Sequence, residues 1–157
     1  LLLEEGAVEL PEGEFNAAFN PEAVVKVTDV LLASHENTAQ IIDARPAARF
    51  NAEVDEPRPG LRRGHIPGAL NVPWTELVRE GELKTTDELD AIFFGRGVSY
   101  DKPIIVSCGS GVTAAVVLLA LATLDVPNVK LYDGAWSEWG ARADLPVEPV
   151  KYVFYRQ

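Results

Sequence analysis

A single cysteine lies in a glycine-rich segment whose residues are suited to hold a reactive thiol. The segment SCGSGVT at 107–113 contains Cys108, the only cysteine among the 157 residues. It follows the apolar run 103–106 and precedes a second apolar run, 114–124, that is long enough for a helix. Backbone N–H groups at such a turn and the positive end of the helix dipole favour an anion, so we expect this thiol to ionise readily. The segment therefore predicts a site that holds a thiolate, or a group attached to it.

Short apolar strands alternate with helices along the chain and would position this turn. We expect strands at 40–43, 69–72, 104–107 and 128–132, and helices at about 20–34, 74–79, 85–94, 112–124 and 135–142. Asn20 and Pro21 are typical of a helix start, and Thr85 with Glu88 has the spacing of a capping box. The alternation predicts an α/β fold with a mostly parallel central sheet and helices on both faces. Segment 45–64 is expected to be irregular and too polar for the core.

Composition limits the class of protein and its partners. Hydrophobic residues make up 47% and charged residues 24%, as in one ordinary soluble domain, and the net charge of −10 argues against nucleic acid and anionic membranes. No apolar stretch reaches the roughly 20 residues that cross a membrane. One cysteine requires no oxidising compartment, so we expect a cytoplasmic protein. Cys108 and the distant His35 and His65 do not make a ligand set, so we expect no metal and no cofactor.

Four motifs in order resemble those of the rhodanese (sulfurtransferase) superfamily, over about residues 21–150. They are DAR at 43–45, GHIPGA at 64–69, the cysteine segment 107–113 and DGAW at 133–136. Within that superfamily the cysteine segment resembles the 3-mercaptopyruvate sulfurtransferases, because Gly109 and Ser110 stand where thiosulfate-using members tend to carry basic residues. The resemblance implies an enzyme that moves sulfur from 3-mercaptopyruvate to a small thiol, cyanide or a reduced thioredoxin-like protein, with release of pyruvate.

The resemblance also implies roles within the cysteine segment. Cys108 would attack the donor sulfur and carry it as a persulfide, whose charge the loop amides would stabilise as an oxyanion hole does. Those amides belong to Gly109, Gly111, Val112 and Thr113, and Thr113 would also cap the next helix. Ser110 would hydrogen-bond the substrate or orient a proton donor. A buried structural cysteine and a turn-forming serine are the alternatives to these roles.

Two arginines of the polar segment, Arg49 and Arg58, match positions at which mercaptopyruvate sulfurtransferases hold the substrate carboxylate and keto oxygen. A planar guanidinium suits bidentate binding of a carboxylate. Spacing alone would favour two solvated loop charges, so their substrate-binding role depends on the resemblance.

Other polar residues are expected to support the site or to lie outside it. Asp43 ends a predicted strand, where parallel sheets bind ligands, and pairs with Arg45 or with loop amides. His65 is expected to hold loop and sheet together rather than act as a base. Arg62 and Arg63 are interpreted as surface charge.

Three other functions compete with this interpretation. A phosphatase of similar fold needs an arginine six positions after the cysteine, but Ala114 stands there. A non-catalytic binding module usually lacks the cysteine, which is present. A thiosulfate sulfurtransferase or a sulfur-relay domain would use the same loop, and a relay would need Arg49 and Arg58 less.

Residues 1–19 are interpreted as an interdomain linker or arm, 20–150 as the rhodanese-like catalytic domain and 151–157 as a tail of unknown role. The chain does not begin with methionine. The resemblance implies that an N-terminal rhodanese-like domain of the same protein completes the cleft and supplies a histidine and an aspartate to Ser110. We therefore expect weak turnover from this chain alone.

Overall fold

A parallel sheet of five strands lies at the centre of the computed structural model, which describes residues 6 and 11–149. The strands are β1 (Val24–Val25), β2 (Gln40–Asp43), β3 (Leu70–Asn71), β6 (Ile104–Ser107) and β7 (Val129–Tyr132). Their order across the sheet is β1-β7-β6-β2-β3, and each neighbouring pair is parallel. The predicted α/β fold with a mostly parallel sheet is confirmed. The interpretation of residues 151–157 as a tail lies outside the described residues.

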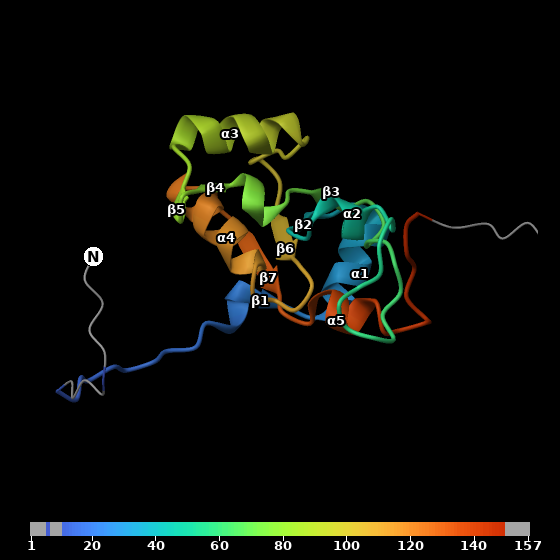
Figure 1. Cartoon of the computed structure of the whole chain (residues 1–157), viewed down its shortest axis with the longest axis horizontal. Coiled ribbons are helices and arrows are strands. Elements are labelled where there is room, and N and C mark those ends of the chain that lie inside the picture. The colour runs from blue at the N-terminus through green and yellow to red at the C-terminus, as the bar shows by residue number, and fades with distance from the viewer. Residues whose placement is uncertain (1–5, 7–10, 150–157) are drawn as a thin grey trace, which may run out of the picture.

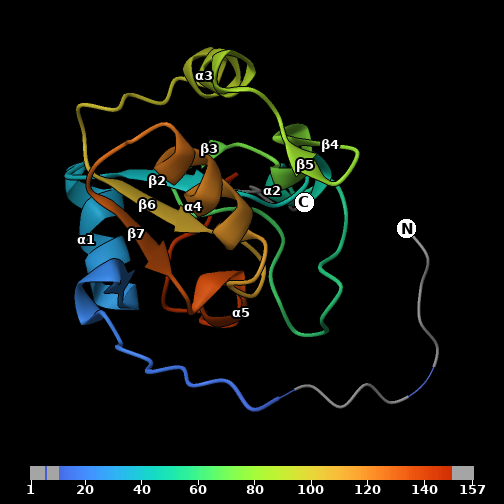
Figure 2. The same ribbon diagram turned by 90° about the vertical axis from the view of Figure 1, so that its left-hand side faces the viewer.

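Helices cover both faces of this sheet, as predicted. Figures 1 and 2 show α3 (Thr86–Gly95) and α4 (Ala114–Thr123) on one face, and α1 (Val27–Glu36) with α5 (Ala135–Trp139) on the other. Successive side chains of a strand point to opposite faces. In β6, Ile104 and Val106 accordingly join the core beneath α4, whereas Ile105 joins the core beneath α1 and α5.

The first predicted helix, at 20–34, is interrupted by a strand. Asn20 accepts a hydrogen bond from the Glu22 N–H (3.0 Å), but it caps only the short 3₁₀ helix η1 (Pro21–Ala23). Strand β1 follows, and α1 begins at Val27. The prediction was wrong here because two adjacent β-branched valines favour extended backbone over helix.

A small hairpin replaces the end of the helix predicted at 74–79. Only the 3₁₀ helix η2 (Trp74–Glu76) is helical, and β4 (Val78–Arg79) and β5 (Glu82–Leu83) then pair antiparallel. Glu80 and Gly81 between them both have positive φ angles, 53° and 86°. This combination matches the turn that joins two strands by two residues.

The predicted capping box at the start of α3 is confirmed. The Glu88 N–H donates to Thr85 Oγ1 (3.4 Å), and the Thr85 N–H donates back to Glu88 Oε2 (3.0 Å). Arg79 donates to both carboxylate oxygens of Glu88, at 2.8 and 3.1 Å. The hydrogen bonds from Arg79 and then Thr85 lower the pKa of Glu88 to about 2. The hairpin is thereby tied to α3.

Segment 45–64 is not wholly irregular and not wholly outside the core. It contains α2 (Ala47–Phe50), and Arg45, Phe50 and Glu56 are buried in it. The prediction failed because it treated charged residues as exposed. Paired charges can be buried, and the pairs are described below.

We predict that Tyr132 makes the fold sensitive to alkali. This side chain is fully buried at the end of β7 and donates to Glu138 Oε2 at 2.7 Å. Burial, and secondly the Glu138 carboxylate, raise the pKa of Tyr132 far above its ordinary value of about 10. Above about pH 10 this tyrosine loses its proton in the unfolded chain but keeps it in the folded chain. The free energy of unfolding therefore falls as the pH rises.

An alkaline titration followed by tyrosinate absorbance and by circular dichroism checks this prediction. The Tyr132 tyrosinate signal, assigned by comparison with Tyr132→Phe, should appear only together with the loss of secondary structure. Ionisation of Tyr132 in the folded chain near pH 10 would contradict it.

Candidate active site at the carboxyl ends of β2 and β6

The order of strands predicts where this sheet binds a ligand. Strands β2 and β6 are neighbours, but the chain continues from β2 to β3 on one side and from β6 to β7 on the other. Loops that diverge in this way leave a crevice at the carboxyl ends of the strands. The segment after Asp43 and the loop after Ser107 meet at this crevice.

The cysteine loop is tied down by the start of α5. The carbonyl oxygen of Cys108 accepts from the Trp136 N–H at 2.9 Å. The carbonyl oxygen of Gly109 accepts from both the N–H (3.0 Å) and the hydroxyl (2.7 Å) of Ser137. Both carbonyl groups therefore point toward α5.

The opposite side of the loop presents free N–H groups. In a planar trans peptide the N–H points away from the carbonyl, so the N–H groups of Gly109 and Ser110 point away from α5. Within the described part of the chain, no N–H from Gly109 to Ala114 donates to a protein acceptor. Such a run of donors next to Cys108 and before α4 is suited to bind an anion.

Cys108 itself is only 1% exposed and belongs to the apolar core on the α4 face. The loop residues that follow it, not the cysteine, line the hollow described below. The thiol therefore lies beneath the loop. A second sulfur atom bound to this thiol would lie about 2 Å beyond it, the length of an S–S bond.

Two loop glycines occupy positions where a side chain would collide with a neighbour. A β-carbon at Gly109 would lie 2.7 Å from Nη2 of Arg49, so the guanidinium of Arg49 lies directly against the loop. Gly111 has a φ of +84°, and a β-carbon there would lie 2.7 Å from Oδ1 and 3.1 Å from the carbonyl oxygen of Asp133. Only glycine fits both the backbone angle and the space at position 111.

A buried network of charges brings Arg49 to the loop. Arg45, 1% exposed, donates to Asp43 Oδ2 (2.6 Å) and to Glu56 Oε1 (2.7 Å). Arg49 donates through Nε to both oxygens of Glu56, at 3.2 and 3.1 Å, and also through Nη2 to Oε2. Sequence reasoning considered the Asp43–Arg45 pair but missed Glu56, because nothing marks a buried glutamate in a proline-rich polar segment.

Further contacts hold Arg45 in place. It donates to the Gly64 carbonyl at 2.7 Å, and its guanidinium carbon lies 4.3 Å from the ring centre of Trp136. The side chain of Trp136 is 1% exposed. The ring of Trp136 also makes a cation–π contact with Arg45, a member of the charged network.

A hollow of about 190 Å³ lies over the loop and brings together four of the six predicted substrate-binding residues, namely Arg49, Arg58, Gly109 and Thr113. Its lining residues are Arg49, Glu56, Pro57, Arg58, Leu61, Gly109, Ser110 and Thr113. Arg58 donates to the Ser137 hydroxyl at 3.0 Å, and so reaches the residue that holds Gly109. Ser110 is exposed at the hollow.

Three loop residues are placed differently from what their predicted roles suggest. Val112 is 72% exposed, and neither Val112 nor Gly111 lines the hollow. Thr113 lines it and precedes α4, but its side chain makes no capping hydrogen bond. Its helical backbone angles, φ −73° and ψ −16°, differ from the extended ones typical of a side-chain cap.

His65 lies outside the hollow and joins several segments. Its Nδ1 lies 2.8 Å from the Phe50 carbonyl oxygen, and its ring stacks on Phe50 with centres 3.7 Å apart. Its backbone forms a bridge with Glu148 through hydrogen bonds of 2.7 and 3.0 Å. These contacts support segment 45–64 rather than a proton transfer at Cys108.

Arg62 is not the surface charge that the sequence suggested. It donates to four carbonyl oxygens, those of Trp139, Gly140, Arg142 and Leu145. Burial lowers the pKa of Arg62 from its ordinary value. Arg63, in contrast, pairs with Asp55, whose side chain is 82% exposed. Arg62 thus supplies hydrogen bonds to the carbonyl groups at the end of α5. The start of the same helix holds the cysteine loop.

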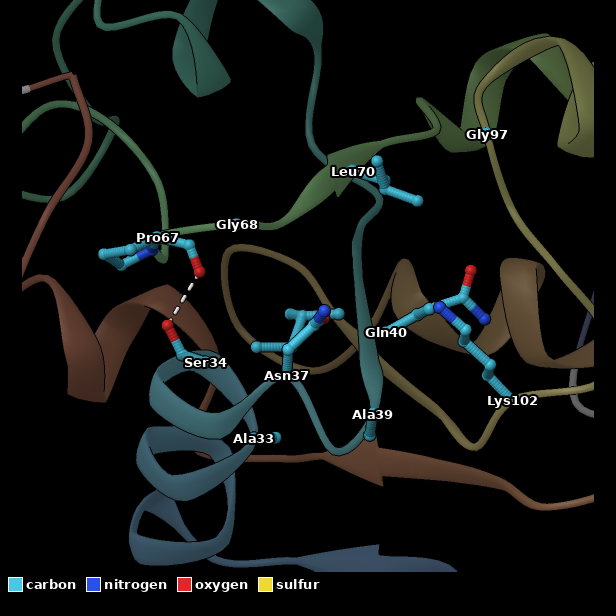
Figure 3. A pocket seen from close by; sticks show the side chains of 11 residues that line it. Ala33, Ser34, Asn37, Ala39, Gln40, Pro67, Gly68, Leu70, Gly97 and Lys102 are labelled. Carbon is cyan, nitrogen blue, oxygen red and sulfur yellow. Dashed lines mark hydrogen bonds between the residues drawn. The ribbon is translucent and has the colours of Figure 1, made fainter.

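A second hollow, also of about 190 Å³, lies next to Gln40 and Leu70, the first residues of β2 and β3 (Figure 3). Two of its polar side chains are paired within the protein: the Ser34 hydroxyl donates to the Pro67 carbonyl (2.7 Å), and the Gln40 amide exchanges hydrogen bonds with the Ser99 backbone. It contains no nucleophile comparable to Cys108. The hollow over the cysteine loop is therefore the candidate active site.

Residues 6 and 11–149 contain no group of three or more His, Cys, Asp or Glu side chains placed to hold a metal ion. No helix among these residues is both long and apolar enough to cross a membrane.

Comparison with known proteins identifies relatives of the whole described domain. Residues 26–142 match the family model described as the rhodanese-like domain. A 3-mercaptopyruvate sulfurtransferase of Escherichia coli O157:H7 is 99% identical over 151 residues, which make up 96% of this chain and 54% of that protein, in its C-terminal part. Thiosulfate/3-mercaptopyruvate sulfurtransferase 1, mitochondrial, of Arabidopsis thaliana is 40% identical over 138 residues, 87% of this chain and 36% of that protein.

A solved structure shows the same fold. The crystal structure of SseA from Escherichia coli, described for the rhodanese fold and catalytic mechanism of 3-mercaptopyruvate sulfotransferases, matches with a TM-score of 0.75 and 97% identity. The match covers 88% of this chain and 51% of that one. The chain thus spans about half the length, or less, of these relatives.

Proposed function

The chain belongs to the rhodanese-like domain family, and from this membership we propose that it transfers sulfur from 3-mercaptopyruvate through a persulfide on Cys108. The observation that carries the proposal is the loop at the end of β6. The carbonyls of Cys108 and Gly109 are held by α5, the loop N–H groups from Gly109 have no acceptor among the described residues, and Arg49 lies against Gly109. This arrangement provides a nucleophile, donors for an anion and a cation for the donor carboxylate.

The reaction proceeds in two displacements. The thiolate of Cys108 attacks the sulfur of 3-mercaptopyruvate, an S–S bond forms and the C–S bond breaks. The electron pair of that bond leaves with carbon as the enolate of pyruvate, which then takes up a proton. In the second step an acceptor thiolate or cyanide attacks the outer sulfur, and Cys108 is released as thiolate.

The residues around the hollow supply binding and charge stabilisation. Arg49 and Arg58 orient the carboxylate and keto oxygen of the donor, as planar guanidinium groups suit such oxygens. The free N–H groups from Gly109 to Thr113 stabilise the persulfide anion, and Ser110 hydrogen-bonds the substrate from the exposed side of the loop. Asp43 and His65 hold the surrounding segments in place.

The partners of the reaction are part of the same proposal. Small thiols, cyanide or a reduced thioredoxin-like protein accept the sulfur, and an N-terminal rhodanese-like domain of the same protein completes the site next to Ser110. The length of the relatives, about twice that of this chain, supports such a domain. We place the reaction in the cytoplasm, since an unpaired reactive thiol persists in a reducing compartment.

Intact mass measured after each donor separately tests the proposal. After 3-mercaptopyruvate the chain should gain one sulfur atom, and the Cys108→Ser variant, which keeps size and loop geometry, should gain none. Gain from thiosulfate alone would keep the mechanism but replace the donor, a reading that the name of the Arabidopsis relative supports. No gain from either donor, in this chain or in the near-identical E. coli relative, would reject the proposal.

A further inference from the structure

We propose that Glu56 sets the donor specificity of the site, because it holds the hollow at one net positive charge and so favours a singly charged donor. This inference rests on the proposed function. It assigns to Glu56 a specificity-determining role through charge and through the position of Arg49, without contact with the reacting sulfur.

The carboxylate of Glu56 is fully engaged by two arginines. Its side chain is 1% exposed. Oε1 accepts from Arg45 Nη1 (2.7 Å) and Arg49 Nε (3.2 Å), and Oε2 accepts from Arg49 Nε (3.1 Å) and Nη2. The fork of Arg49 is thereby turned toward Glu56, while its edge touches the loop at Gly109. Glu56 thus fixes the direction of Arg49 and neutralises it.

The charges around the hollow can then be assigned to pairs. Arg45 is matched by Asp43, and Arg49 is matched by Glu56. Arg58 has no acidic partner within 4 Å in the part of the chain that the structure describes, and it donates instead to the neutral Ser137 hydroxyl. The other lining residues are uncharged. One positive charge therefore remains for a bound donor.

This charge fits a donor with one negative charge. The carboxylate of 3-mercaptopyruvate carries one, whereas thiosulfate carries two. The second charge of thiosulfate would find no further unmatched cationic side chain in the hollow and would approach the Cys108 thiolate. An unpaired charge of this kind weakens binding, and more so where protein displaces water.

The ratio of kcat/KM for thiosulfate to kcat/KM for 3-mercaptopyruvate tests the inference. Glu56→Gln keeps the shape of the side chain and removes its charge, so we expect the ratio to rise about tenfold or more. Glu56→Asp keeps the charge and should leave the ratio near that of the wild type. A merely structural role would lower both values equally, because the ratio does not depend on the folded fraction, and an unchanged ratio in Glu56→Gln overturns the inference.

A further variant keeps the test independent of folding. Asp55→Asn makes the same charge change one residue away, at a side chain that is 82% exposed and paired with Arg63, and should not change the ratio.

Failure of this inference can be told apart from failure of the proposed function. If wild-type protein takes sulfur from neither donor, the proposed function is wrong. If it takes sulfur but the ratio stays constant across these variants, only the role of Glu56 is wrong. Where turnover of the chain is slow, the rate of persulfide formation on Cys108, followed by mass, supplies the same ratio.

Discussion

Replacing Arg45 with methionine should lower the free energy of unfolding by about 3–5 kcal/mol, because it removes one member of a buried network of charges. Arg45 donates to Asp43, Glu56 and the Gly64 carbonyl, and it is 1% exposed. Methionine has a similar length but no donor. Two buried carboxylates would then lose a partner, and the Gly64 carbonyl would lose its hydrogen bond.

Urea unfolding followed by tryptophan fluorescence measures this loss, which is large against the 5–15 kcal/mol typical of a domain. Arg63→Met is the matched control. That arginine also pairs with an aspartate, but both side chains are exposed, and we expect its unfolding midpoint to equal that of the wild type. Equal midpoints for Arg45→Met and Arg63→Met would show that the buried network contributes nothing measurable.

The parts of this fold that could be predicted have strong local signals. The run before Cys108 is apolar without interruption, which is typical of a strand buried on both faces, and β6 is such a strand. Thr85 and Glu88 mark a helix start by side-chain hydrogen bonds within four residues. Glycines after a strand mark a close approach of backbone, which occurs at Gly109 and Gly111. Such features need no knowledge of distant residues.

The parts that could not be predicted depend on contacts between distant residues. Arg62 satisfies carbonyl groups 77 to 83 positions away, and only the fold reveals that it is not a surface charge. Glu56 becomes a buried residue only when Arg45 and Arg49 close around it. The two valines of β1 favour extended backbone, but their pairing with β7, near the other end of the sequence, is visible only in the fold. Local propensity carries no information on these pairings.

Replacing Gly111 with alanine should slow sulfur transfer to Cys108 by about 100-fold, because the loop N–H groups lose their alignment. The backbone at this position has a φ of +84°, which costs a residue with a β-carbon about 1–3 kcal/mol. The added carbon would also lie 2.7 Å from Asp133 Oδ1 and 3.1 Å from the Asp133 carbonyl oxygen. A backbone atom cannot move aside as a flexible side chain can, so the loop itself must shift.

Gly109→Ala is the matched control for this prediction. The new carbon at position 109 meets the end of the Arg49 side chain, 2.7 Å from Nη2, and no positive φ is required there. Arg49 would swing aside, so we expect a higher KM for the donor with a smaller fall in the rate of persulfide formation at saturation. Single-turnover mass measurements on both variants separate the two effects. A Gly111→Ala rate at or above that of Gly109→Ala would show that the alignment of the loop amides does not control the reaction of Cys108.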